Sequence, residues 1–225
     1  MEDEGRTFAI GDVHGCLGEL KALVARIQPT SQDRLIFLGD LVNRGPDSAG
    51  VIRYVRQLRN RRCLMGNHER RLLAYRRTGD ASILKSYDVA TIESLEPEDW
   101  DFIDNFDLFL EVPRAQAVFV HGGFLPWLPW YQQPEAVMLN LQVVEPATRL
   151  WGKRTDMTDS PSWQNFWEGP PFVICGHTPR LEVFRRPWSM CIDTACVYGG
   201  KLTACNVNTL ELIQVPAYLN YVERR

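Results

Sequence analysis

The chain has 225 residues, of which 45% are hydrophobic and 24% charged, as expected for one globular domain with a full hydrophobic core. A net charge of −3 argues against a protein that coats nucleic acid or binds a membrane surface, so neither partner is expected. The acidic segment 1–6 does not resemble a signal peptide, and no apolar run approaches the roughly 20 residues of a membrane span. The six cysteines include no Cys-x-x-Cys pair, which indicates reduced thiols and predicts a cytoplasmic protein.

The first half of the chain alternates strand and helix patterns. Apolar runs of strand length at 8–10, 35–38 and 63–65 enclose helical patterns at 17–27 and 51–58. This β-α-β-α-β order predicts a largely parallel sheet with right-handed crossovers.

The second half is predicted to hold a cap, more strands and a long loop. Segment 78–111 has a helical, acidic pattern that favours a small helical cap over a sheet element. Strands are expected at 117–120 and 172–175, and extended hairpins over 189–216 with a turn at Gly199-Gly200. Residues 124–170, rich in Pro and Trp, predict a structured loop with a helix near 134–141. We expect a single domain over residues 1–225.

Five polar motifs each follow an apolar run directly. They are Gly11-Asp-Val-His-Gly15, Gly39-Asp-Leu-Val-Asn-Arg-Gly45, Gly66-Asn-His-Glu69, His121-Gly-Gly123 and Gly176-His-Thr178. Because open α/β sheets gather ligands at the carboxyl ends of their strands, one sheet could bring all five together. All four histidines of the chain lie in these motifs, beside Asp12, Asp40 and Asn67. A lone histidine is more often a core or surface residue, but four of four indicate a site for Mn, Fe or Zn.

In this order the motifs resemble those of the calcineurin-like metallophosphoesterase superfamily, specifically its phosphoprotein-phosphatase branch. That branch includes bacterial Ser/Thr protein phosphatases and symmetrical bis(5'-nucleosyl)-tetraphosphatases. The resemblance covers residues 8–205. It implies an α/β fold, a four-layer α-β-β-α sandwich with two sheets between helices, and a metal-dependent hydrolase.

The resemblance also implies roles for individual residues. Asp12 and His14 would hold a first metal, Asp40 would bridge both metals, and Asn67, His121 and His177 would hold the second. Two cations about 3.5–4 Å apart can acidify a shared water to hydroxide for in-line attack on phosphorus. Mn is expected, with Fe, Zn, Co and Ni as alternatives.

Two further side chains in these motifs match catalytic positions of the family. Arg44 can fork onto two phosphate oxygens and offset charge in the transition state. His68 follows the ligand Asn67 and resembles the general acid for the leaving oxygen.

Weaker assignments each have an alternative. Arg154 is a second phosphate-binding arginine or a surface arginine, and Tyr198 lies near substrate or in the core. Asp193 could hydrogen-bond a ligand histidine. Glu69 either orients His68 or caps the following helix.

Two larger groups of side chains also have alternatives. The aromatic residues either stack on a base or pack as a flap; they are Phe124, Trp127, Trp130 and Tyr131. The arginine run is interpreted as a solvated helix face, with a substrate channel as the alternative; it comprises Arg53, Arg56, Arg59, Arg61 and Arg62.

Position 43 bears on the substrate. Protein phosphatases have Asp there, as the partner of the catalytic histidine, whereas this chain has Asn43. An amide holds an imidazolium less well, so His68 should be a weaker proton donor. A nucleotide phosphate needs that proton less than a serine alkoxide does. We therefore expect symmetrical hydrolysis of dinucleoside tetraphosphates. Alternatives are a phosphoprotein substrate, as Glu69 suggests, then polyphosphate, or a phosphate-binding module without activity.

Overall fold

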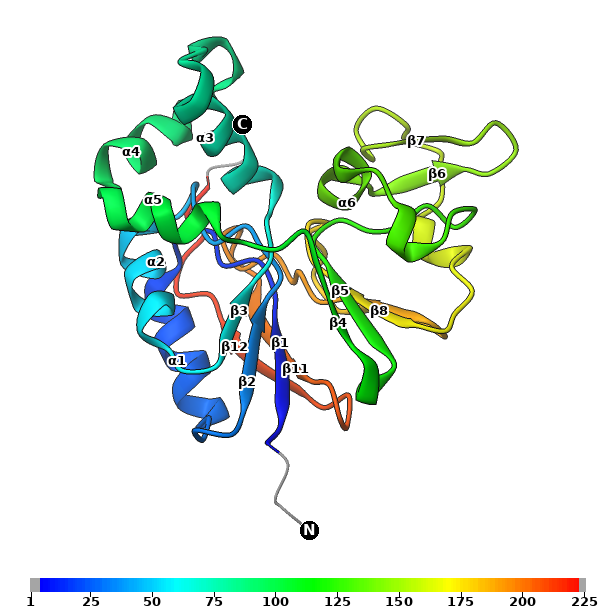
Figure 1. The fold of residues 1–225 in the computed structure, drawn as a ribbon, viewed down its shortest axis with the longest axis horizontal. Helices are drawn as coiled ribbons and strands as arrows, with labels where there is room; N and C mark the ends of the chain where they lie inside the picture. The colour runs from blue at the N-terminus through cyan, green and yellow to red at the C-terminus, as the bar shows by residue number, and fades with distance from the viewer. Residues whose placement is uncertain (1–4, 223–225) are drawn as a thin grey trace.

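Two five-stranded sheets face each other in the structure, a computed structural model that describes residues 5–222 (Figure 1). The first sheet has the order β12-β11-β1-β2-β3. Its parallel centre consists of β1 (Thr7–Ile10), β2 (Arg34–Phe37) and β3 (Arg61–Cys63), which confirms the predicted β-α-β-α-β unit. The antiparallel strands β11 (Lys201–Asn206) and β12 (Leu212–Pro216) complete it.

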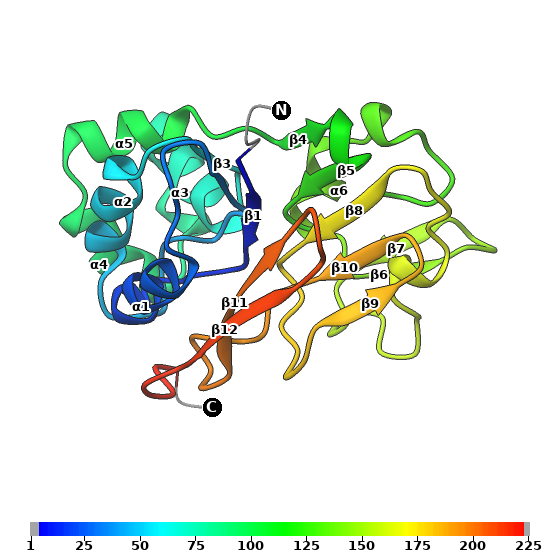
Figure 2. The same ribbon diagram turned by 90° about the horizontal axis from the view of Figure 1, so that it is seen from below.

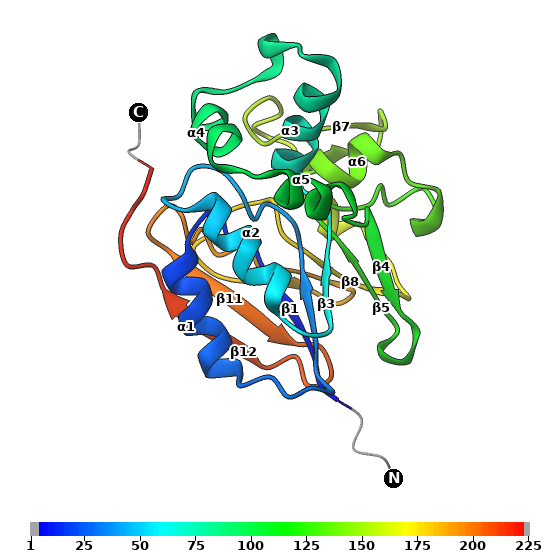
Figure 3. The ribbon, with the colours of Figure 1, turned by 60° about the vertical axis from the view of Figure 1, so that its left-hand side comes forward.

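Helices cover the outer face of the first sheet (Figures 1 and 3). They are α1 (Leu17–Ile27) and α2 (Ser48–Gln57), whereas α3 (Asn67–Thr78) lies above the carboxyl ends of the strands. On α1 the apolar residues recur at helical spacing, and Leu20, Leu23 and Ile27 are buried against the sheet. A left-handed Gln28 ends this helix one residue before Pro29.

A small cap follows α3 and is built from η1 (Ala81–Ile83), α4 (Ser86–Ser94) and α5 (Pro97–Asp104). Figure 3 shows α4 above α2. The expectation that helical structure runs to residue 111 is wrong, because β4 (Phe109–Val112) pairs with β5 (Ala117–Val120) at the edge of the second sheet. Backbone pairing overrides the local helical pattern there.

The second sheet has the order β4-β5-β8-β10-β9. Its remaining strands are β8 (Phe172–Cys175), β9 (Phe184–Arg186) and β10 (Ser189–Cys191). The predicted hairpin at Gly199-Gly200 is wrong: β10 belongs to this sheet and β11 to the first, so the chain crosses between sheets there (Figure 2). The actual hairpin joins β11 to β12.

The outer face of the second sheet is covered by the Trp-rich segment. It includes the 3-10 turns η3 (Trp130–Gln132) and η4 (Trp163–Asn165), the helix α6 (Glu135–Asn140), and the hairpin β6 (Val143–Glu145) with β7 (Leu150–Gly152). A further 3-10 turn, η2 (Pro113–Ala115), lies outside this segment and joins β4 to β5. The predicted helix near 134–141 is confirmed as α6.

Three separate apolar clusters mark three interfaces between layers. One lies between the first sheet and its helices, one between the second sheet and the Trp-rich segment, and one between the sheets, where Ile36, Phe119 and Ile174 are fully buried. The four-layer α/β prediction is therefore confirmed, although the fourth layer is mostly loop. All six cysteines are buried free thiols, and no helix within residues 5–222 is long and apolar enough to cross a membrane.

Candidate metal centre

The polar motifs meet at the carboxyl ends of strands, but it takes both sheets to assemble them. His14 and Asp40 follow β1 and β2, and His68 lies in the first turn of α3 after β3. His121 and His177 follow β5 and β8 of the facing sheet. The expectation of one sheet is thus corrected: each sheet contributes one half of the cluster.

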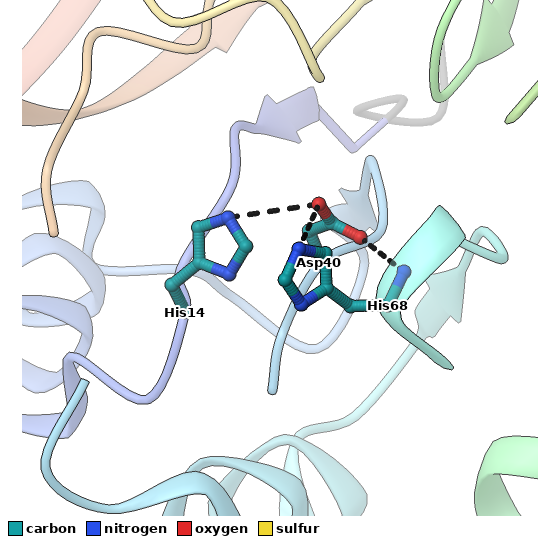
Figure 4. A group of neighbouring side chains, drawn as sticks. All are labelled: His14, Asp40 and His68. Atoms are coloured by element: carbon teal, nitrogen blue, oxygen red, sulfur yellow. Dashed lines mark hydrogen bonds and ion pairs between the residues drawn. The ribbon is translucent and has the colours of Figure 1, made fainter. Parts of the chain in front are cut away.

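Asp40 lies at the centre of the cluster (Figure 4). Its Oδ2 is 3.6 Å from His14 Nε2, 3.5 Å from His121 Nε2 and 3.9 Å from His68 Nε2. Two groups of possible metal ligands therefore share it, one with His14 and His68 and the other with His121 and His177. A carboxylate shared between two groups is what a pair of cations requires.

The backbone around these ligands is held in sparsely populated conformations. The φ angles of His14, Asp40 and His177 are 47°, 49° and 66°, in the left-handed region that non-glycine residues rarely adopt. Backbone hydrogen bonds from Val13 and His14 to the Asp40 carbonyl tie the first two loops together at 3.1 and 2.8 Å. The surrounding structure thus fixes where each ligand points.

Hydrogen bonds to backbone carbonyls orient two of the rings. His14 Nδ1 donates to Val42 O at 2.9 Å, and His121 Nδ1 donates to Leu38 O at 2.8 Å. Each neutral ring therefore turns the lone pair of its Nε2 toward the centre. His121 Nε2 faces the Asn67 Oδ1 at 3.1 Å, so two electron pairs point at each other. A cation held by both atoms would remove that repulsion.

Burial raises the pKa values of the acids in the cluster, and neighbouring negative charges add to this effect on Asp12. Asp12 is buried, and its pKa is raised by burial, then by Asp193 and Asp40. Burial raises the pKa of Asp40 to about 6 and lowers the pKa values of His14 and His177. Crowded carboxylates beside neutral imidazoles are the donor set of a divalent metal, so the residues present fit such ions.

Two acids next to the cluster are structural. Glu69 caps α3 by accepting from Gly66 N and also accepts the N–H groups of Asp40, Leu41 and Val42 at 2.7–3.2 Å. It holds the Asp40 loop rather than His68. Asp193 accepts from Ala195 N at 3.0 Å and hydrogen-bonds no histidine within the described residues 5–222, so that expectation is wrong.

The sequence over residues 5–212 matches the family profile described as calcineurin-like phosphoesterase. The chain belongs to this family. It is accordingly a hydrolytic enzyme of a family that depends on divalent metal ions.

Relatives of this calcineurin-like phosphoesterase align along nearly its whole length. It is 28% identical to the asymmetrical bis(5'-nucleosyl)-tetraphosphatase PrpE of Oceanobacillus iheyensis, with 96% of this chain and 94% of the relative covered. It is also 28% identical to the symmetrical bis(5'-nucleosyl)-tetraphosphatase of Janthinobacterium sp. (strain Marseille), covering 93% and 95%. A crystal structure of a candidate diadenosine tetraphosphatase superposes with a TM-score of 0.85 at 28% identity, covering 96% of each chain.

In this phosphoesterase a cavity of about 280 Å³ opens beside Asp40, Asn67 and His177. Arg44 lines it, with Nη1 2.8 Å from His14 Nε2 and the guanidinium 5.6 Å from the centre of the Tyr198 ring. Arg154 also lines it, and its Nη2 donates to Pro179 O at 2.9 Å. The structure thus brings both arginines and Tyr198 to the cluster.

The aromatic residues of the loop do not line this cavity. Phe124 is fully buried, and Trp127 and Trp130 pack against the apolar cluster between the second sheet and the Trp-rich segment. Trp130 meets the Phe109 ring edge-on at 5.5 Å. The packed flap is therefore the correct alternative for Phe124, Trp127 and Trp130. Tyr131, by contrast, is exposed.

The arginine run pairs mainly with the acids that follow it. Arg53 and Arg56 contact Asp99 of α5, and Arg62 contacts Asp107. Arg53 and Arg56 thus join the cap to α2, and Arg62 joins β3 to the segment after α5, so these side chains form ion pairs in addition to facing solvent.

Three residues around His68 escaped the sequence analysis. Tyr87 stacks on the His68 ring with centroids 5.4 Å apart, Asp88 hydrogen-bonds Asn43 at 2.8 Å, and Arg71 pairs with Asp88 at 2.7 Å. Tyr87 and Asp88 come from the cap helix α4, where an acid in the first turn indicates only helix capping. Their position beside His68 is a property of the tertiary structure.

Proposed function

We propose that this enzyme hydrolyses dinucleoside tetraphosphates, cleaving them symmetrically into two nucleoside diphosphates. The observation that carries the proposal is the charge of the cavity beside Asp40. Arg44, Lys153 and Arg154 all line it, more cationic groups than a single phosphate monoester needs. A chain of phosphates can span these three groups while one phosphorus lies at the metal centre.

An adjoining cavity is suited to a nucleoside. It measures about 330 Å³ and shares Pro179 and Tyr198 with the first, and Leu181 and Ala195 add apolar surface. Arg180 lies at its wall, 4.0 Å from the centre of the Phe184 ring. An aromatic ring and a guanidinium are groups on which a base stacks. The names of the two aligned tetraphosphatases support the same substrate class.

The residues that would hold the metals include Asp40 and three histidines of the two groups that share it, and Asp12 and Asn67 would complete the set. We assign Asp12 and His14 to one ion, Asn67, His121 and His177 to the other, and Asp40 to both, with Mn as the expected metal. When bound, the ions would activate a water for attack and offset the phosphate charge.

The other groups act through contacts with the substrate. Arg44 reaches into the cavity between the cluster and Tyr198, where it can bind two oxygens of the attacked phosphate. His68 is buried and turns Nε2 toward Asp40, where it can stabilise the leaving oxygen.

The test is a parallel assay of diadenosine tetraphosphate, a phosphoserine peptide and polyphosphate with Mn-loaded enzyme. We expect the highest kcat/KM on the tetraphosphate, with ADP as the sole nucleotide product. Equal amounts of ATP and AMP would show asymmetrical cleavage and overturn the proposed position of attack. A higher kcat/KM on the peptide would make the enzyme a protein phosphatase, the alternative that the Gly66-Asn-His-Glu69 motif favours.

A further inference from the structure

The cap helix α4 contributes a buried carboxylate to the hydrogen bonds around His68. Asp88 is fully buried at the third position of α4. Its Oδ2 accepts from Arg71 Nε at 2.7 Å, and its Oδ1 accepts from Arg71 Nη2 at 2.9 Å. Such a two-pronged ion pair requires an ionised carboxylate. Asp88 therefore acts only as an acceptor toward its neighbours.

Asp88 determines which way the Asn43 amide points. Asn43 Nδ2 donates to Asp88 Oδ1 at 2.8 Å. Turning the amide over would place Asn43 Oδ1 against that carboxylate oxygen, an arrangement of two acceptors. Asn43 Oδ1 is buried without a hydrogen-bond partner among the described residues. Leaving Asn43 Oδ1 without a hydrogen bond is unfavourable, but placing it against the Asp88 carboxylate would be worse, because that carboxylate can only accept.

The Asn43 amide in turn determines which nitrogen of His68 carries the proton. His68 Nδ1 faces two donors, Asn43 Nδ2 at 3.0 Å and Arg71 Nη2 at 3.3 Å. A proton on Nδ1 would point at both of them, so Nδ1 must be the acceptor. The proton of the neutral ring then lies on Nε2, which is buried, has no hydrogen-bond partner among residues 5–222, and faces the metal cluster.

We propose that Asp88 is a positioning residue that, through Arg71 and Asn43, holds His68 as the neutral tautomer with its proton on Nε2. The inference rests on the proposed role of His68 at the leaving oxygen. In that role Nε2–H donates a hydrogen bond while the P–O bond breaks and its electron pair stays on the leaving oxygen. No proton is transferred in this step. Neutral imidazoles serve as such donors in other enzymes.

This arrangement selects among substrates. A nucleoside diphosphate leaves as a stabilised anion, for which a hydrogen bond is sufficient. A serine alkoxide needs a full proton, which a neutral imidazole gives up reluctantly. The proposed tautomer thus explains how the chain can lack the aspartate of protein phosphatases at position 43 and still cleave anhydrides.

The direct test needs neither turnover nor a substrate. Protein labelled with ¹⁵N-histidine contains only four imidazoles, and their two nitrogens can be distinguished by long-range ¹H–¹⁵N correlation NMR. The His68 signals are those missing from His68→Gln. We expect, in metal-free protein and with Zn²⁺ added, an unprotonated Nδ1 and a protonated Nε2. A protonated Nδ1 at neutral pH, with or without a proton on Nε2, would overturn the proposal whatever the substrate proves to be.

A matched pair of variants tests the role of Asp88. Asp99 occupies the same third position of α5, is equally buried, accepts from the N-cap backbone and pairs with Arg53. Asp88→Ala should free Asn43 to accept from His68 Nδ1–H and lower kcat on diadenosine tetraphosphate about 10- to 100-fold, with KM little changed. Asp99→Ala should cost similar stability but alter neither the tautomer nor kcat. Equal losses of kcat in the two variants would mean that Asp88 only supports the fold.

An exchange of the two side chains separates position from charge. Asn43→Asp combined with Asp88→Asn keeps one buried carboxylate but places it against His68 Nδ1. We expect near-native thermal stability, a protonated Nδ1, and a phosphoserine-to-tetraphosphate rate ratio raised at least about tenfold. An unchanged tautomer and unchanged rate ratio would contradict control by Asp88.

Discussion

Asp40 is the side chain that both groups of possible metal ligands share. Three imidazole nitrogens lie within 3.9 Å of its Oδ2, and its Oδ1 accepts from His68 N at 3.0 Å. It joins groups from both sheets, so its loss should affect two ions where the loss of any other ligand affects one.

Asp40→Asn is accordingly expected to be the most damaging single ligand change. Metal content measured after dialysis should fall for both ions, with affinity reduced by more than about tenfold. His121→Ala and Asp12→Asn should each release mainly one ion. If either of them cost more activity and more metal than Asp40→Asn, Asp40 would not be the shared ligand.

The buried acids also predict how stability depends on pH in the absence of metal. Burial raises the pKa of Asp40 from 3.8 to about 6, so the folded protein holds this proton more tightly than the unfolded chain does. This stabilising contribution is complete below about pH 4 and is lost as the pH rises through 6.

Thermal unfolding should therefore show a gap between metal-loaded and metal-free protein that widens between about pH 4 and pH 7. The comparison cancels the contributions to stability of titrating groups far from the site. One such group is Asp33, whose pKa Arg6 lowers to about 2. A gap that is constant across this range would show that protons and metal do not compete for these carboxylates.

At the scale of elements, the loop after β5 has a structural role, whereas the loop before β9 lines a cavity. The first packs Trp127 and Trp130 onto the second sheet, whereas the second places Leu181, 73% exposed, at the edge of the apolar cavity. The packing of the two tryptophans indicates a structural role, and the exposure of Leu181 beside the cavity indicates a substrate-binding role.

Trp130→Ala should lower the free energy of unfolding by about 1–3 kcal/mol and leave KM for diadenosine tetraphosphate unchanged. Leu181→Ala should do the opposite, raising that KM while leaving stability and the turnover of p-nitrophenyl phosphate intact. Chemical denaturation and steady-state kinetics on both substrates measure these effects. A raised KM in Trp130→Ala alone would return the aromatic loop to the substrate site.

At the scale of the whole molecule, the metal centre depends on how the two sheets sit against each other. His14 and Asp40 come from one sheet and His121 and His177 from the other. The apolar layer between the sheets fixes their separation, and we propose that residues 1–225 unfold as one cooperative domain.

Two isoleucines test this dependence, since both are fully buried. Ile174→Ala lies between the sheets and Ile52→Ala between α2 and the first sheet. Each should cost about 2–5 kcal/mol, but only Ile174→Ala should also weaken metal binding. Calorimetry should show a single transition for both, and two separate transitions would divide the chain into two domains.

The sequence by itself determined the strand–helix alternation of the first half and the polar residues at the strand ends, because apolar periodicity and glycine-flanked motifs are local signals. It failed where pairing decides: Phe109–Val112 became an edge strand, and the chain at Gly199-Gly200 crosses between sheets. Both outcomes depend on partners more distant in sequence than any periodicity reaches.

Within the site the same division holds. The six ligand candidates and Arg44 are visible as residue types in motifs, whereas Asp88 and Arg71 are ordinary helix residues in the sequence. Only tertiary packing places Asp88 beside Asn43, 45 positions away. The unusual Asn43 could therefore be recognised in the sequence. The tautomer that we propose for His68 follows from the buried carboxylate of Asp88, because neighbours in space determine the direction of a hydrogen bond.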